Sequence, residues 1–476
     1  MSSEASKVGY EIERRRFLRA ALIASAFAIG ERPLRSLAAE TFGVSTQREA
    51  KVYFPAEQEA KRYVPAEQEA KRYFAPVKVA RNRIIREVVG LRPYRPEGFV
   101  VEAERLGDKL LVHNYGHGGA GVTLSWGTAS LAVDLARDFM QTQTHPLPQV
   151  VLTGPQTHPL PQVVLTGPRT GPLPQVVLTG TPTGSSPATQ STLIRTQSSR
   201  RRQRSRNTPR RFAVLGCGVN GLSTARLLQR RFQDGAGTVT IYAKDLPPET
   251  TSNIAGAFWY PSSVFDSQRV TSKFSDQFRL ACQISNKAFQ TLVGTEYGVR
   301  WTETYELLRN EPSLARELLG GGQLYPQTEI HQDAPRYFGF PYVRQFSTMM
   351  IEPHVYLSAL LRDFYIAGGK VVVREFRNRE EIARLQEPVI FNCTGLGARE
   401  LFNDQELIPV RGQLEVLLPQ PEVDYCYLSG SSYMFPRRDG IILGGTWDHQ
   451  DWSLEPNAEQ TTEILEAHAE IMKGLK

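Results

Sequence analysis

A glycine-rich segment at residues 216–221, GCGVNG, has the spacing of a dinucleotide-binding loop. The first glycine permits a tight turn, the second lets the backbone approach a pyrophosphate, and the third allows a helix to pack closely on a strand. Amides and dipole at the helix N-terminus would stabilise the phosphate charge. The alternative is a glycine turn that only packs. The predicted binding residues of this loop are Gly216, Gly218, Val219, Asn220 and Gly221.

The elements around the loop are those that such a site needs. An apolar run at 212–215 is typical of a buried parallel strand. A helix with apolar residues at three-residue spacing follows the loop, and a second strand is expected at 238–242. Asp245 lies 24 residues after Gly221, near the place of a ribose-binding acid, although Lys244 precedes it.

The later elements predict the fold class. A helix is expected at 354–366, with strands at 370–373 and 388–391. Antiparallel strands are expected at 411–418, 431–436 and 440–445, before a helix at 457–473. We therefore predict an α/β protein with a Rossmann-like, parallel-sheet cofactor domain and a second, mainly antiparallel β-sheet substrate domain.

Composition sets the outer limits. The chain has 476 residues, 41% of them apolar, and a net charge of +7, which suits one large domain or two to three ordinary ones. No stretch reaches the roughly 18 apolar residues of a membrane span. Four cysteines without a CxxC pair suggest no metal site.

The first 210 residues contain segments that we do not expect to belong to the compact part of the protein. Arg14–Arg19 followed by an apolar run resembles a twin-arginine export signal, so export to the periplasm is expected, with a cytoplasmic location as the alternative. A short basic amphipathic helix is the other interpretation of this segment. Residues 40–77 carry decapeptide repeats, and 141–210 form a proline-rich repeat and arginine-rich linker. The arginines lack interleaved aromatics, so no specific nucleic acid is expected as partner.

Residues 211–476 resemble the D-amino-acid oxidase family of FAD enzymes almost continuously. The resemblance lies in 241–259, in Asn392–Gly395, in Arg411–Gln413, in Tyr433–Pro436 and in Leu443–Thr446. It implies FAD as cofactor and a D-amino acid and O2 as substrates, and a homodimer is left open. Besides the first loop, the resemblance places Lys244, Asp245, Thr250, Thr251, Ser252, Thr394 and Gly395 at the cofactor.

The last third of the family's sequence is found near the N-terminus instead. Residues 78–140 contain Gly90–Pro93 and His113–Gly119, which resemble that portion. In the usual order Val79 would follow Lys476, so the chain looks circularly permuted. A misjoined gene model is the rival explanation.

A second glycine cluster in this segment has its own physical logic. It precedes an apolar, helix-like stretch at 124–135. The resemblance implies that the N-terminus of this helix stabilises negative charge on the reduced flavin. For His113 and His117 we predict structural hydrogen bonds within the loop rather than acid–base catalysis. By resemblance, Thr123 would bond the flavin's carbonyl edge. The predicted cofactor residues here are Gly118, Gly121, Val122 and Thr123.

Three residues are predicted to bind the substrate. Arg92 matches the family arginine that binds the substrate carboxylate, a task that suits a planar, permanently charged guanidinium. Arg95 is the alternative and is expected to form an ion pair on the surface instead. Tyr433 matches a tyrosine whose hydroxyl reaches the same carboxylate, and the carbonyl of Gly119 could accept from the amine.

Departures from the family bear on the substrate. Ser429 stands where mammalian relatives have a lid tyrosine, and Tyr427 is out of register. Relatives acting on D-aspartate carry arginine where this chain has Trp447, which favours neutral D-amino acids. Three competing interpretations remain. They are a glycine or sarcosine oxidase, a catalytically inert flavin-fold protein that binds through its basic linker, and a plain NAD dehydrogenase.

Overall fold

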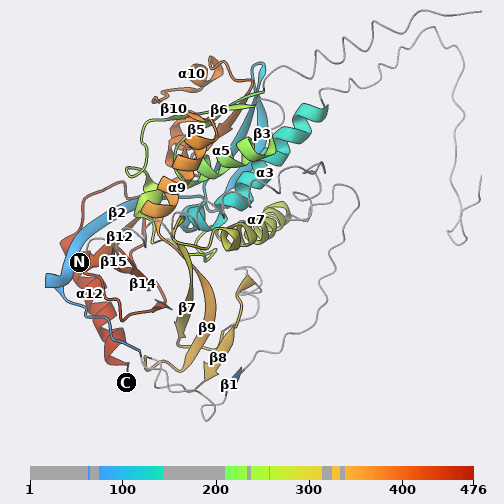
Figure 1. Cartoon of the computed structure of the whole chain (residues 1–476). Coiled ribbons are helices and arrows are strands. Elements are labelled where there is room, and N and C mark those ends of the chain that lie inside the picture. The colour runs from blue at the N-terminus through green and yellow to red at the C-terminus, as the bar shows by residue number, and fades with distance from the viewer. Residues whose placement is uncertain are drawn as a thin grey trace, which may run out of the picture. The chain divides into compact units, whose positions relative to one another are not determined.

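The computed structural model describes residues 74–142, 210–232, 237–256, 258–312, 324–332 and 338–475, and the backbone of 63–64. The predicted signal (1–39), most of the decapeptide repeats and nearly all of the linker therefore lie outside the described residues. All the described residues belong to one compact unit (Figure 1). Among the described residues, no helix combines the length and the apolar character needed to cross a membrane.

One sheet has six strands, of which five are parallel and one edge strand is antiparallel. The central strand β5 is completely buried over residues 212–215, as expected of a strand covered on both faces. In order across the sheet, the strands are β10 (Lys370–Val373), β6 (Thr238–Ala243), β5 (Arg211–Leu215), β11 (Val389–Asn392), β4 (Lys109–Tyr115) and β3 (Val100–Leu106).

Helices cover this sheet and form the main core with it. Helix α3 (Gly121–Thr142) packs against both α5 (Val219–Arg231) and α7 (Ser272–Thr291), and α5 also packs on α9 (Pro353–Ile366). The cluster of buried side chains runs from Leu124 in α3 to Leu222 in α5 without a break between the two parts of the chain. Burial of these apolar side chains is the main force that holds the parts together.

The second sheet has ten strands and is mainly antiparallel, which together with the first sheet confirms the predicted fold class. Strand β2 (Ile84–Tyr94) pairs antiparallel with β12 (Ile408–Leu417) along its length (Figure 1). Helix α12 (Ala458–Lys473) packs on β12, β14 and β15. The remaining strands are β7 (Val299–Leu308), β8 (Glu329–Gln332), β9 (Tyr342–Ile351), β13 (Tyr425–Ser429), β14 (Ser432–Arg437), β15 (Gly440–Gly444), β16 (Asp448–His449) and β1 (Tyr63–Val64).

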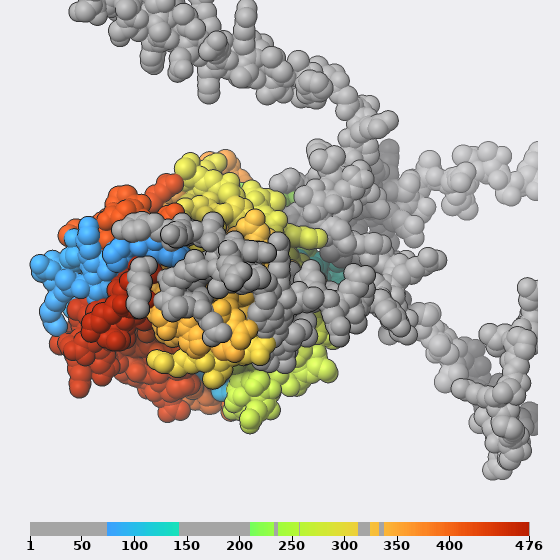
Figure 2. Space-filling model, turned by 90° about the horizontal axis from the view of Figure 1, so that it is seen from below, coloured from blue at the N-terminus to red at the C-terminus, as the bar shows by residue number. Residues whose placement is uncertain are grey.

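The segment 74–142 is thus built into both sheets formed by 210–475. Its start lies beside the C-terminal helix: the amide of Val77 donates to Met472 Sδ over 3.2 Å, and Tyr425 donates to the carbonyl of Ala75 over 2.9 Å. Figure 2 shows the blue surface of this segment directly against the red surface of the C-terminal part.

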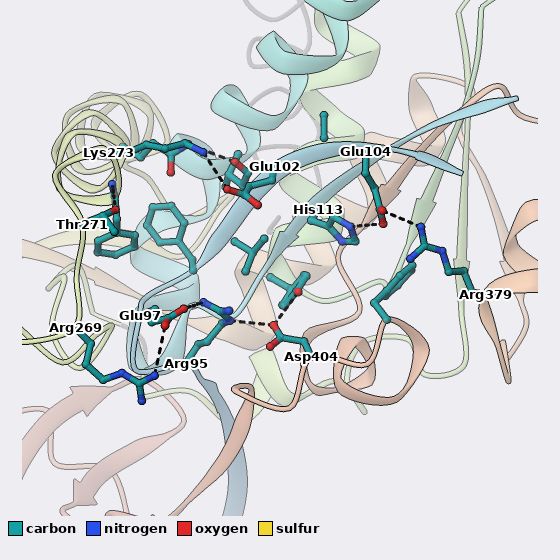
Figure 3. A pocket seen from close by; sticks show the side chains of 18 residues that line it. Arg95, Glu97, Glu102, Glu104, His113, Arg269, Thr271, Lys273, Arg379 and Asp404 are labelled. Atoms are coloured by element: carbon teal, nitrogen blue, oxygen red, sulfur yellow. Dashed lines mark hydrogen bonds and ion pairs between the residues drawn. The ribbon is translucent and has the colours of Figure 1, made fainter. Parts of the chain in front are cut away.

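A groove of about 570 Å³ runs along the edge strand β3, and ion pairs across it join the same two segments (Figure 3). Lys273 reaches Glu102 over 2.9 Å, and Arg379 reaches Glu104 over 2.8 Å. Arg95 contacts Asp404 over 2.9 Å with both side chains largely buried. Arg95 therefore forms the expected ion pair, but the pair is largely buried rather than at the surface.

The structure predicts a pH dependence of stability through His468. Its ring is fully buried, accepts from the Tyr427 hydroxyl over 2.5 Å and donates to the carbonyl of Gly444, and burial lowers its pKa to about 4. The unfolded chain takes up this proton near pH 6.5, so the stabilisation is complete above that pH and is lost as pH falls towards 4. The full loss is about 3 kcal/mol.

Urea unfolding at pH 7.5, 6 and 5 measures this effect. The variant His468→Gln should show a smaller slope of unfolding free energy against pH. Part of the slope should remain, because burial also lowers the pKa of His117, to about 3. An unchanged slope in His468→Gln would contradict the assignment.

Candidate functional site

The predicted cofactor residues follow the carboxyl ends of four neighbouring parallel strands. The register pairs Leu215 with Tyr242 and Asn392 with both Leu215 and His113, so β6, β5, β11 and β4 end at the same level. Ligands of open α/β sheets bind at this edge. The loops that meet there are 244–245, 216–221, 394–395 and 116–121.

The first glycine loop has the geometry that its sequence predicts. Gly216 has φ of +102°, and a Cβ there would lie 2.4 Å from the carbonyl of Cys393. A Cβ on Gly221 would lie 2.0 Å from the carbonyl of Gly216, so only glycine lets α5 pack this closely on β5.

The N-terminus of α5 has the features of an anion-binding site. Gly218 is its N-cap without a side-chain cap bond, and the first turn carries no acidic residue. Ser252 lies at this end, since its Oγ accepts from the amide of Val219 over 3.0 Å. Amides and dipole therefore favour a phosphate here.

A second helix N-terminus lies next to the first. Helix α3 begins at Gly121 directly after a 3-10 turn at Gly118–Ala120, and a Cβ on Gly121 would lie 3.7 Å from Asn220 Nδ2 of α5. Val122, in its first turn, is buried. Gly118 has φ of +54°, and the amide of Gly119 donates to Ser263 over 2.9 Å. Two adjacent helix N-termini fit the pyrophosphate of FAD and the negative charge of a reduced flavin ring.

The other predicted cofactor residues take different positions. Thr123 is buried, donates to the carbonyl of Phe258 over 3.2 Å and accepts from the amide of Tyr260, so its bond to a flavin stays a prediction. Thr394 donates to Asn392 over 2.7 Å next to Gly395 at φ +57°. The remainder lie at the surface or in the short helix α6 (Thr251–Ile254): Lys244 and Asp245 are more than half exposed, and Thr250 is the N-cap of α6, which begins with Thr251.

The sheet register places Arg92 and Tyr433 on one face of the ten-stranded sheet. Arg92 pairs with Val410, Leu414 of the same strand pairs with Gly444, and Gly444 pairs with Tyr433. Directly opposite residues, and residues two apart, share a face. The two predicted substrate residues therefore project to the same side, although 341 positions separate them in the chain.

Two glycines make room for these side chains. A Cβ on Gly412 would lie 2.1 Å from Nη1 of Arg92, and a Cβ on Gly444 would lie 2.2 Å from the ring of Tyr433. These glycines belong to the motifs Arg411–Gln413 and Leu443–Thr446, which carry the family resemblance. The sequence alone does not show what the two glycines do. Their role is steric and appears only with the register.

This face adjoins the cofactor loops. Tyr94, two residues after Arg92, would touch a Cβ on Gly118 at 3.1 Å, and its backbone bridges to His117. On the other side, a Cβ on Gly256 would lie 2.9 Å from Phe435, which stacks on Tyr433 with centroids 5.0 Å apart. The structure thus brings the predicted substrate and cofactor residues together.

The guanidinium of Arg92 lies against two backbone carbonyls and the ring of Trp447. Its Nη1 donates to the carbonyls of Arg411 (3.2 Å) and Thr446 (3.3 Å), and its Cζ lies 5.0 Å from the centroid of the Trp447 ring. Tyr94 stands edge-on to Trp447 at 5.8 Å. The two carbonyls fix the position of the guanidinium, and the Trp447 ring covers it with an apolar surface.

The histidines and Tyr427 differ from a simple interpretation of the sequence. His113 and His117 do form structural hydrogen bonds, but these reach Asn392 and Asn220 rather than other residues of their own loop. Tyr427 is fully buried and bonded to His468, so it is not a mobile lid.

Comparisons with known proteins agree with this arrangement. A family model described as "FAD dependent oxidoreductase" matches residues 40–135 and 211–476. A D-amino-acid oxidase of Rubrobacter xylanophilus is 34% identical over 54% of this chain and 75% of its own length. A human D-aspartate oxidase is 31% identical, over 54% and 74%. A solved glycine oxidase of Bacillus cereus has a TM-score of 0.41 at 14% identity over 54% of this chain and 77% of that one, too little to support any conclusion on function.

Proposed function

The chain belongs to the D-amino-acid oxidase family of FAD-dependent oxidoreductases, and from this premise we propose that it oxidatively deaminates neutral D-amino acids with O2 as acceptor. The products are a 2-oxo acid, ammonia and hydrogen peroxide, with one water consumed. When bound, FAD supplies the group that accepts the α-hydrogen as hydride.

The observation that carries the proposal is the common face shared by Arg92 and Tyr433, which adjoins the second glycine loop at His117 and Gly118. Arg92, fixed by two backbone carbonyls, binds the substrate carboxylate, and the hydroxyl of Tyr433 donates to the same group. The carbonyl of Gly119 accepts from the amine. Positioning of this kind supplies rate without a protein base.

Trp447 supports a neutral substrate. Its ring lies against Arg92 where the resemblance gives D-aspartate oxidases an arginine, and a flat apolar ring does not compensate a second carboxylate. The stacked rings of Phe258 and Phe435, 4.8 Å apart, add apolar surface behind Tyr433.

A peroxide assay on the purified FAD-loaded protein tests this proposal. We expect peroxide with D-alanine and D-methionine, much less with D-aspartate, and none with the L-enantiomers. Activity confined to glycine or sarcosine would assign the other oxidase class, and bound FAD without activity on any amine would indicate an inert flavin protein.

We also propose that the chain is circularly permuted relative to its relatives. The contact of Val77 with Met472, which places the start of the first segment beside the end of the second, supports this order. A rearranged gene, with 211–476 placed before 79–140, should yield an enzyme of equal activity. A rearranged protein that binds no FAD would count against a simple permutation.

Export through the twin-arginine route is proposed as well, on the motif Arg14–Arg19, which lies outside the described residues. Replacing both Arg14 and Arg15 by lysine should retain the protein in the cytoplasm. An unchanged distribution between cell fractions would favour a cytoplasmic enzyme.

A further inference from the structure

Each histidine of residues 113–117 is bonded to an asparagine from the other segment of the chain. Nδ1 of His113 lies 3.0 Å from Nδ2 of Asn392, and Nδ1 of His117 lies 3.2 Å from Nδ2 of Asn220. An amide nitrogen can only donate, so each Nδ1 must accept and each neutral ring carries its proton on Nε2.

The opposite nitrogen of each ring is also bonded. Nε2 of His113 donates to Oε1 of Glu104 over 3.0 Å, and Figure 3 shows this carboxylate bridging to Arg379. Nε2 of His117 donates to Oγ1 of Thr128 over 3.0 Å. Both rings are buried, so their orientation is fixed from two sides.

The two asparagines lie at the other cofactor loops. Asn220 belongs to the first glycine loop, in the first turn of α5. Asn392 ends β11, and its Oδ1 accepts from both the amide (3.2 Å) and the hydroxyl (2.7 Å) of Thr394. The His117–Asn220 pair therefore connects the second glycine loop to the first. The His113–Asn392 pair joins strands β4 and β11 just before the second glycine loop and the 394–395 loop.

We propose that His113, His117, Asn220 and Asn392 are positioning residues that hold these three loops at the spacing FAD requires. The inference deepens the family assignment and does not depend on which substrate is used. A ligand that touches several loops binds more tightly when the loops are ordered beforehand, because binding then pays less conformational entropy. Loss of one partner also leaves a buried polar atom without its bond.

The experiment measures FAD release from the holoenzyme by serial dilution, followed by the rise in flavin fluorescence. Asn220→Ala and Asn392→Ala should each weaken FAD binding at least tenfold. The double variant His117→Ala/Asn220→Ala should lose less than the product of its two single effects, because both remove one shared bond.

Asn114→Ala is the matched control. Asn114 is fully buried in the same motif and donates to α5, but to Thr224 within the helix body over 3.1 Å rather than to a loop. It should lower the unfolding temperature as the other variants do and leave the FAD dissociation constant within twofold of the wild type.

A dissociation constant within twofold of wild type in both Asn220→Ala and Asn392→Ala would overturn the proposal, as would multiplicative effects in the double variant. If either alanine variant does not fold, the corresponding Asn→Ser variant replaces it under the same criteria. Because no substrate is added, a wild-type protein that holds FAD but oxidises no D-amino acid would refute the proposed function and leave this inference standing.

Discussion

Arg92→Leu should lower kcat/KM for a neutral D-amino acid on the order of 10³-fold, mostly through a higher KM. The reason is that a desolvated carboxylate would lose its charged partner, which costs about 2–5 kcal/mol, and each 1.4 kcal/mol is about tenfold. Steady-state kinetics with D-methionine measures the effect. FAD content should stay that of the wild type, because the described contacts of Arg92 are to the sheet and Trp447.

Two further variants make this result specific. Arg92→Lys keeps the charge but not the fork of donors, so it should recover only part of the activity. Arg95→Leu should instead reduce stability, since it leaves the largely buried Asp404 without its ion pair, with little change in KM. A large KM increase in Arg95→Leu together with normal kinetics in Arg92→Leu would reverse the assignment.

Gly412→Ala should also reduce activity strongly, although it removes no polar group. Its added methyl would lie 2.1 Å from Nη1 and 2.4 Å from Nη2 of Arg92, so the guanidinium must leave its present position. We expect a loss of kcat/KM of about 10²-fold, since misplacing a binding group by about 1 Å costs this much. Kinetics and flavin content, measured on the same preparation, separate this from loss of cofactor.

Gly445→Ala is the matched control for Gly412→Ala. It lies in the neighbouring Leu443–Thr446 motif, but the nearest atoms to its Cβ position are 3.4 Å away, an ordinary contact. Its kinetics should stay within a few-fold of wild type. Equal loss in both variants would mean that the strands themselves, and not the position of Arg92, are sensitive to added bulk.

Local sequence patterns were sufficient for four of the six strands of the cofactor sheet, whereas β3 and β4 were not predicted as strands. The buried run at 212–215, the strand at 370–373 and the helix at 354–366 are observed within one residue of their predicted bounds. Each of these elements has a short apolar run or a helical spacing of apolar residues, and a glycine or proline lies at one of its ends. The roles of the glycines in 216–221 could also be predicted, because the constraints of the turn and of helix packing act within these six residues.

Pairs of strands or side chains that lie far apart in the sequence could not be predicted from local patterns. Strands β7 and β9 pair over ten residues, yet their sequences mix charged and apolar positions and each alone gives a weak signal. The histidine–asparagine pairs join residues 103 and 279 positions apart. Asparagines at the ends of two predicted cofactor loops were the available signal, but only the folded register shows which ring each one meets.

The most direct test of the account is the visible spectrum of the purified protein under anaerobic conditions. We predict a bound-flavin absorption band that bleaches on adding D-alanine or D-methionine and stays unchanged with the L-enantiomers. A bound flavin that no D-amino acid bleaches would contradict the proposed reaction. Protein without flavin, despite ample FAD during expression, would contradict the assembly of the two segments into one cofactor site.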